Sequence, residues 1–111
     1  MSYPKDLDDM MWEVYQINLD KGWFEDERTF GDSMALLHSE VSEALEAFRT
    51  RQLEKYTSEN GKPDDVGSEF ADVFIRLLDC CKRYNIDLHA EYNRKITYNR
   101  TRLHKHGGKV L

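Results

Sequence analysis

Two short acidic motifs in the middle of the chain carry the residue types best suited to binding a metal ion. Glu40 and Glu43 are three residues apart, and Glu69 and Asp72 repeat this spacing further along the chain. Residues three apart on an α-helix share one face. Hard cations such as Mg²⁺ prefer oxygen ligands, which four carboxylates supply. The pattern therefore predicts that these four side chains hold magnesium against a polyphosphate.

The two acidic pairs are predicted to occupy matching positions on two helices. At 100° per residue, Glu43 lies at about 300° from Glu40, and Asp72 lies at about 300° from Glu69. On each helix the apolar residues fall at roughly 40–140°, so each acidic pair flanks an apolar stripe. The stripes comprise Leu37, Val41, Ala44, Leu45 and Phe48 on one helix and Val66, Phe70, Val73, Phe74, Leu77 and Cys81 on the other. If the stripes pack together, the four acids converge at one edge of the core, where their repulsion is costly without a cation.

The alternative for each carboxylate is an ordinary solvated position on a helix, because a single Glu-x-x-Glu motif is common. Glu43 and Glu46 form another such motif. Glu46, however, projects to about 240° and faces outward. The matching placement of two pairs favours a metal site over two unrelated solvated pairs.

The composition predicts one globular domain, residues 1–111, and argues against several classes of protein. A chain of 111 residues with 40% hydrophobic residues suffices for one modest core. The net charge of −5 argues against binding a nucleic-acid polymer. We expect no signal peptide and no membrane segment, because no apolar stretch is long enough. Cys80 and Cys81 are adjacent and cannot form an ordinary bridge with each other, so we expect a reducing, cytoplasmic setting.

Helical periodicity and capping residues predict an all-α, four-helix bundle-type domain without strands. The expected helices run from Asp6 to about Gly22, from Asp32 or Ser33 to about Arg51, from Asp64 or Asp65 to about Tyr84, and onward from Asp87. The polar segment 52–63, with its Asn60-Gly61 turn signal, is expected to link the second and third helices. Ile75 and Leu78 lie outside the apolar sector of the third helix, so we expect another subunit to cover that side.

Residues outside the acidic helices are candidates for binding the rest of a phosphorylated ligand. Trp23 and Phe24 lie in an aromatic loop between glycines, where an aromatic ring either stacks on a nucleobase or closes the end of the core. Lys95 and Asn99 lie on or beside the apolar stripe of the fourth helix, with Arg102 adjacent, which is unusual unless they meet a polar partner. The basic, glycine-containing tail that ends near Lys109 either wraps phosphates or is solvated.

The order of these motifs resembles that of the MazG-like, all-α nucleoside triphosphate pyrophosphohydrolases. The resemblance spans roughly Trp23 to Lys109 and rests on Glu40-x-x-Glu43, Glu69-x-x-Asp72, Lys95-x-x-x-Asn99-Arg100 and His106-Gly107-Gly108-Lys109. It implies an all-α bundle that works as a homodimer or homotetramer and needs magnesium. It also implies cleavage of a nucleoside triphosphate between the α- and β-phosphates, which yields a monophosphate and pyrophosphate.

The resemblance also implies roles for individual residues. The four acids Glu40, Glu43, Glu69 and Asp72 would be the magnesium ligands or would orient a metal-bound water. The remaining positions would contact the phosphates, sugar or base, namely Lys95, Asn99, Arg102, Lys109, Trp23 and Phe24. We expect Glu40 to act as the general base, because it lies beside the apolar sector and is the more shielded of its pair.

Three other functions compete with this interpretation and are weighed against the same residues. Phosphoribosyl-ATP pyrophosphohydrolases share the reaction type but act on another substrate. Di-iron carboxylate bundles need Glu-x-x-His pairs, and no glutamate in this sequence has a histidine three residues later. A non-catalytic helical adaptor that oligomerises through the third helix would leave the acids unexplained, and it predicts no effect of magnesium on stability.

Overall fold

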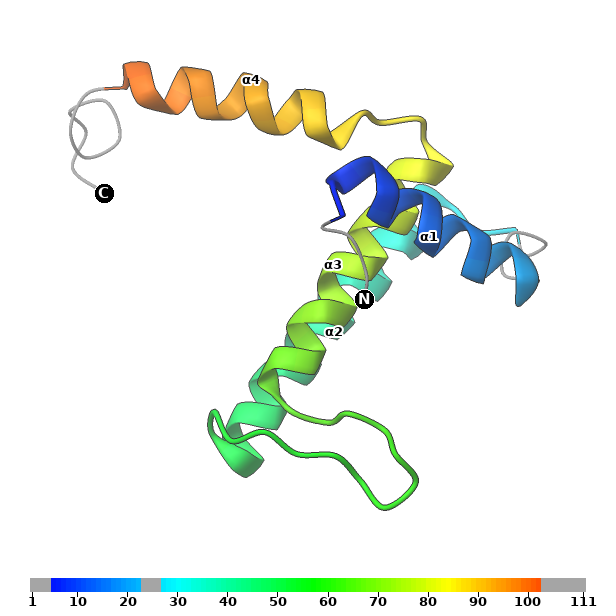
Figure 1. Cartoon of the computed structure of the whole chain (residues 1–111), viewed down its shortest axis with the longest axis vertical. Coiled ribbons are helices and arrows are strands. Elements are labelled where there is room, and N and C mark those ends of the chain that lie inside the picture. Colours follow the sequence, from blue (N-terminus) through cyan, green and yellow to red (C-terminus); the bar gives the residue numbers. More distant parts are fainter. Residues whose placement is uncertain (1–4, 23–26, 103–111) are drawn as a thin grey trace.

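The computed structural model describes residues 5–22 and 27–102, and within these residues it contains four α-helices and no strand (Figure 1). The helices are α1 (Leu7–Asp20), α2 (Phe30–Arg51), α3 (Val66–Arg83) and α4 (Leu88–Thr101). The predicted all-α class is therefore confirmed. Among the described helices, none has both the length and the apolar composition that crossing a membrane would need.

Each helix begins at a side chain that caps its first turn. Asp6, Asp65 and Asp87 cap α1, α3 and α4 as predicted, each accepting a hydrogen bond from a backbone N–H three residues later. The predicted start of α2 was wrong, because Thr29 is its cap. The Thr29 hydroxyl accepts a hydrogen bond from the Asp32 N–H at 3.0 Å, and the Asp32 carboxylate accepts one from the Thr29 N–H at 3.0 Å. The two residues therefore form a capping box, in which Asp32 lies in the first turn of the helix.

Helices α2 and α3 form a long antiparallel hairpin, which the segment 52–65 connects (Figure 1). This segment folds back on itself through an isolated bridge between Thr57 and Pro63 and a hydrogen bond of 2.8 Å from the Ser58 N–H to the Lys62 carbonyl. Gly61 has a φ of 86°, which glycine adopts without strain. The predicted turn is therefore confirmed.

Small side chains line the contact between α2 and α3. Ala44 and Ala47 are buried on α2, and Val66 and Cys80 are buried on α3. Short side chains allow two helices to approach closely. The contact line consequently runs beside Glu40 and along one flank of each predicted stripe, where the stripe residues Ala44 and Val66 are buried. Five large stripe residues remain between 38% and 63% exposed, namely Val41, Leu45, Phe48, Phe70 and Phe74.

Helix α1 crosses the C-terminal half of α3 (Figure 1). A buried polar network fixes this crossing, because the Asn18 amide donates to Asp79 at 2.7 Å and Arg83 donates to the same carboxylate at 2.9 Å. Arg28, just before α2, pairs with Asp79 at 3.4 Å. Leu78 is only 1% exposed, so the prediction that another subunit covers it was wrong. Ile75 does remain exposed in the single chain.

Helix α4 leaves the end of α3 after a short connection in which Asn85 has a φ of 55°. It contacts α1 near its start and then extends away from the α2–α3 hairpin (Figure 1). None of its residues is buried. The radius of gyration of the chain is 17.0 Å, whereas a compact domain of this length has about 13 Å. The helices of one chain therefore form an open arrangement rather than a closed bundle.

Candidate metal centre

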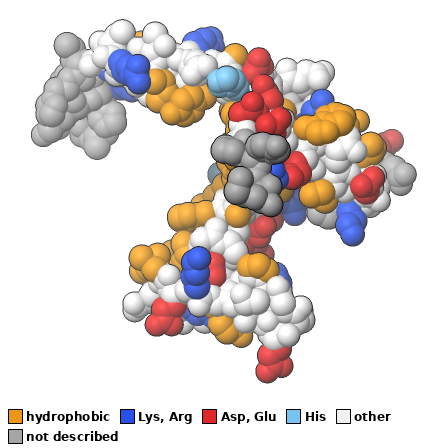
Figure 2. Space-filling model, in the orientation of Figure 1, with side chains coloured by type: hydrophobic (Ala, Val, Ile, Leu, Met, Phe, Trp, Pro, Cys, Tyr) orange, Lys and Arg blue, Asp and Glu red, His pale blue; other side chains and the backbone are white. Residues whose placement is uncertain are grey.

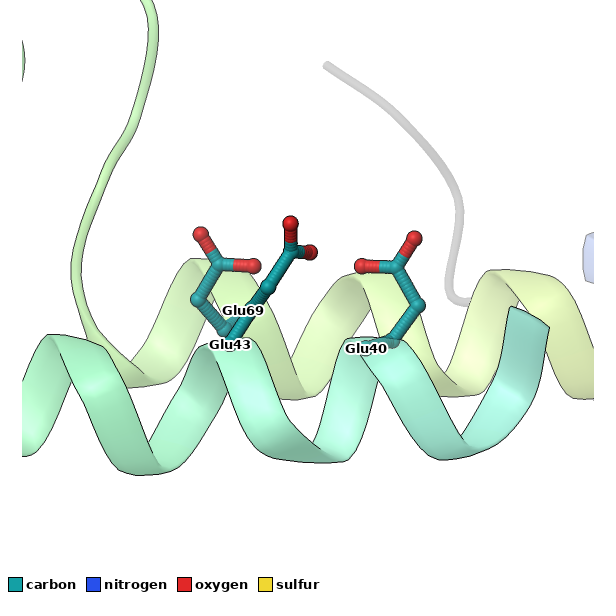
Figure 3. A group of neighbouring side chains, drawn as sticks. All are labelled: Glu40, Glu43 and Glu69. Carbon is teal, nitrogen blue, oxygen red and sulfur yellow. The ribbon is translucent and has the colours of Figure 1, made fainter. Parts of the chain in front are cut away.

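Three of the four predicted carboxylates converge between α2 and α3 (Figure 3). Glu40, Glu43 and Glu69 each offer a carboxylate oxygen, and these oxygens all lie within 4.8 Å of one another. Figure 3 shows the three side chains pointing to the same side of the hairpin. Glu40 is 8% exposed and Glu69 is 6% exposed, whereas Glu43 is exposed. The set has the oxygen donors and the spacing that a divalent cation needs.

Asp72, the fourth predicted ligand, lies outside this group of three but beside it. It follows Glu69 by one helical turn and lines the same hollow as Glu40. Its charge raises the pKa of both Glu43 and Glu69. Asp72 therefore contributes to the negative field of the centre, and a cation held by the other three would lie near it.

The carboxylates of the centre repel one another. A hydrogen bond and the charge of Glu40 raise the pKa of Glu43, while Lys62 works against this shift. Burial is the main cause that raises the pKa of Glu69, and the charges of Asp72, Glu43 and Glu40 add to it. The fold thus holds Glu43 and Glu69 where their charged form is disfavoured. A bound cation would reverse this penalty.

An arginine that the sequence reasoning missed pairs with the centre. Arg76 Nε donates to Glu40 Oε1 at 3.1 Å, and the arginine side chain is 29% exposed. The signal was present in the sequence, because Arg76 follows Asp72 by four residues and projects to about 340° from Glu69, on the acidic face. The pair fixes the orientation of the Glu40 carboxylate and places a cation at the edge of the centre.

A polar hollow lies on each side of the carboxylates. The first has a volume of about 220 Å³ and is lined by Glu40, Asp72, Arg76 and Asn18, among others. The second has a volume of about 230 Å³, and its lining includes Glu43, Glu69, Arg51 and Lys62. Both hollows combine carboxylates with cations, a mixture that suits a metal-bound phosphate. No spacing in the sequence marked Arg51 or Lys62 as part of a site.

A larger apolar hollow adjoins the first polar hollow. It has a volume of about 470 Å³ and lies between α1 and α3, where Val14 and Phe74 contribute to its lining. Asn18, Asp72 and Ile75 line both hollows, so the two lie next to each other. The surface therefore changes from acidic to apolar over a short distance, which suits a ligand with one charged and one apolar end.

The predicted contacts on α4 do not reach the carboxylates within one chain. Lys95, Asn99 and Arg102 are exposed on the helix that extends away from the hairpin (Figure 1). The Lys95 ammonium and the Arg102 guanidinium each lie 5.7 Å from the centre of the Tyr98 ring. Their predicted binding of substrate stays a prediction. Trp23, Phe24 and Lys109, the other predicted contacts, lie outside the described residues.

Comparison with known proteins identified no relative of this chain. A scan against protein-family models, a search of curated proteins and a search of solved structures each found no match to the chain. The resemblance to the MazG-like enzymes therefore remains a prediction from sequence motifs. The case for a metal centre rests on the geometry of Glu40, Glu43 and Glu69.

Proposed function

We propose that this protein is a magnesium-dependent nucleoside triphosphate pyrophosphohydrolase, which releases a nucleoside monophosphate and pyrophosphate. The observation that carries the proposal is the convergence of Glu40, Glu43 and Glu69 from two helices, with two of the three side chains buried. Glutamate is rarely buried unless it is paired, so two buried glutamates with carboxylate oxygens within 4.8 Å of each other favour a bound cation. The order of the acidic and basic motifs along the sequence supports the reaction type.

The residues of the centre fit magnesium better than a softer metal. Every donor is a carboxylate oxygen, and the described residues offer no histidine or cysteine in the group. When bound, Mg²⁺ supplies positive charge that offsets the charge developing on the phosphate oxygens. The open side of the centre, at the exposed Glu43, leaves room for the phosphates.

The chain's own side chains supply the rest of the chemistry. Arg76 lines one hollow, and Arg51 and Lys62 line the other, so each hollow holds a cation that can bind a phosphate oxygen. Glu40 is more buried than Glu43, which confirms the shielding expected from the sequence. Glu40 remains our candidate for the general base that takes the proton of the attacking water. Its contact with Arg76 holds the carboxylate in one orientation.

The adjoining hollows support a nucleotide as the substrate. The carboxylates and cations suit the triphosphate end, and the apolar hollow of about 470 Å³ suits the nucleoside end. Asn18 and Asp72 stand where the two meet, so they are placed to contact the sugar.

The proposal is tested by measuring pyrophosphate release from a panel of ribo- and deoxyribonucleoside triphosphates, with and without Mg²⁺. The native protein is compared with Glu69→Gln and with Glu59→Gln, which makes the same charge change at an exposed position outside the centre. We expect magnesium-dependent release that Glu69→Gln abolishes and Glu59→Gln retains. Absence of release by the folded native protein would refute the proposal. Turnover of phosphoribosyl-ATP would then favour that activity, and no turnover would favour a non-catalytic adaptor.

A further inference from the structure

The segment 52–65 brings a lysine to the edge of the acidic centre. Lys62 lines the hollow of about 230 Å³ together with Glu43 and Glu69, which are two of the three converging carboxylates. Figure 3 shows the end of this segment rising from α3 on the side to which the three carboxylates point. The positive charge of Lys62 opposes the rise in the pKa of Glu43, so the lysine already acts on the centre.

Hydrogen bonds fix the backbone of Lys62. Its N–H donates to the side-chain oxygen of Asn60 at 3.1 Å. Its carbonyl accepts from the Ser58 N–H at 2.8 Å and from the Ser58 hydroxyl at 3.2 Å. Gly61 precedes it with a φ of 86°, and Pro63, whose ring fixes its own φ, follows it. The side chain of Lys62 therefore starts from a defined point of the segment.

The base of the segment is tied to both helices that carry the carboxylates. The Arg51 guanidinium, at the end of α2, lies 3.7 Å from the centre of the Tyr56 ring and 3.9 Å from the Asp64 carboxylate. The Tyr56 N–H donates to the Asp65 carboxylate at 2.8 Å, and Asp65 is also the N-cap of α3. These contacts hold Lys62 beside the centre.

The lining of this hollow contains more acidic than basic side chains, and only one of its cations has no fixed partner. The acidic residues are Glu43, Glu46, Asp64 and Glu69, and the basic residues are Arg51 and Lys62. Figure 2 shows both acidic and basic side chains over the lower end of the hairpin, where the segment 52–65 lies (Figure 1). Arg51 is engaged with Tyr56 and Asp64, whereas Lys62 is exposed and takes part in no ion pair among the described residues. Lys62 can therefore change its partner at little cost.

A cation that belongs to the chain competes with a cation that arrives from solution. Lysine carries a compact charge and three donors on a flexible stem, so Lys62 can offset the charges of Glu43 and Glu69 without occupying a ligand position. A divalent ion held between the carboxylates would be repelled by this charge. A phosphate would instead attract the lysine, because charge-assisted hydrogen bonds to phosphate oxygens are strong.

We propose that Lys62 is a built-in counterion of the centre, which weakens the binding of free metal and moves to the phosphates when a metal–polyphosphate complex enters. The metal and the polyphosphate then strengthen each other's binding, because the anion neutralises the charge that opposes the metal. The protein thus takes up the metal together with its anionic ligand rather than before it. This inference rests on the metal centre of the proposed function, but it requires no turnover.

The test measures two affinities of the full-length protein by isothermal titration calorimetry. These are the affinity for Mg²⁺ alone and the affinity for inorganic pyrophosphate at saturating Mg²⁺. Lys62→Met removes the charge and keeps an unbranched stem. We expect this variant to bind Mg²⁺ about 5-fold more tightly than the native protein. We expect it to bind pyrophosphate about 10-fold more weakly.

Two further variants serve as controls. Lys62→Arg keeps the positive charge and should retain both native affinities within about 2-fold. Lys55→Met makes the same substitution at an exposed lysine of the same segment that does not line the hollow, and it should leave both affinities unchanged.

The opposite signs of the two changes separate a counterion from simpler roles. A lysine that only orders the segment would weaken both affinities when it is replaced. A lysine that only binds the phosphates would weaken pyrophosphate binding and leave Mg²⁺ binding unchanged. Either result would overturn the proposal, and so would a native protein that binds no Mg²⁺.

The same variants distinguish this inference from the proposed function. Opposite changes in the two affinities, with no pyrophosphate release from any nucleotide, would support the counterion and refute the pyrophosphohydrolase. Nucleotide turnover that requires the same Mg²⁺ concentration in Lys62→Met as in the native protein, with unchanged affinity for Mg²⁺ alone, would overturn the counterion and leave the proposed function in place.

Discussion

Replacing Glu69 by glutamine should stabilise the metal-free protein while abolishing its response to magnesium. Glu69 is 6% exposed, and its carboxylate faces those of Glu40 and Glu43 with oxygens within 4.8 Å. Two unit charges at this separation repel by roughly 1 kcal/mol in water and about 3.5 kcal/mol at an effective dielectric constant of 20. Glutamine removes the charge and keeps the shape, with a donor NH2 group in place of one acceptor oxygen. We expect a gain of about 1–3 kcal/mol in the free energy of unfolding without metal.

In the presence of magnesium, the stability of the native protein should catch up with or exceed that of Glu69→Gln. A ligand present at 100 times its dissociation constant stabilises the native state by about 2.7 kcal/mol. The native protein should gain this stabilisation, and Glu69→Gln should lose most of it together with one ligand.

The assay is thermal unfolding at fixed protein concentration and neutral pH, in chelator and in saturating MgCl₂. The control is Glu59→Gln, which should follow the native protein in both conditions because its side chain is exposed outside the centre. In chelator the melting temperature of Glu69→Gln should lie several degrees above that of the native protein. A variant less stable than the native protein in chelator, combined with a native protein that magnesium does not stabilise, would refute our account of the centre.

Three further predictions concern the effect of pH, the Arg76–Glu40 pair and the buried Leu78. The pKa values of Glu43 and Glu69 are raised in the folded protein, so the ionised forms of these two residues lower its stability. Without metal, their contribution to the free energy of unfolding should therefore become more favourable as the pH falls from neutral towards 5. The rise in melting temperature caused by magnesium should accordingly be larger at pH 7.5 than at pH 5. Arg76→Met removes the partner of Glu40 and should destabilise the protein by about 1–2 kcal/mol, because the pair is only partly shielded from solvent. The same variant should lower pyrophosphate release. Arg76→Lys should retain part of the stability and part of the activity. Leu78→Ala should lower the free energy of unfolding, measured in urea, by about 2–5 kcal/mol, because the Leu78 side chain is only 1% exposed. A decrease of less than about 1 kcal/mol would contradict the place of Leu78 in the core.

The helices and their caps could be predicted because these signals are local. Asp6, Asp65 and Asp87 each cap a helix through a backbone N–H only three residues away. The start of α2 was mistaken because Thr29 and Asp32 both carry capping side chains and form one box. A cap and its reciprocal partner look alike in sequence.

Helical periodicity alone predicted part of the arrangement of the carboxylates. Periodicity places Glu40 and Glu69 at equivalent positions on their helices, and the structure brings them together with Glu43. It does not say which sector faces the partner helix, because that depends on how closely side chains such as Ala44 allow the backbones to approach. An apolar stripe like that around Phe70 indicates a surface suited to burial, but it does not show what, if anything, covers that surface.

The hydrogen bond between Asn18 and Asp79 has a consequence for what the neighbouring hollow can recognise. An ionised carboxylate only accepts hydrogen bonds, so the side chain of Asn18 must turn its nitrogen towards Asp79. The second hydrogen of that nitrogen and the amide oxygen are the polar groups of Asn18 that the bond to Asp79 leaves over, and Asn18 lines both neighbouring hollows. Because Asp79 also accepts from Arg83 and pairs with Arg28, one carboxylate both ties α1 to α3 and sets the orientation of an amide in the wall of these hollows. A substitution of Asp79 would therefore alter the packing of the helices and the polarity of that wall together.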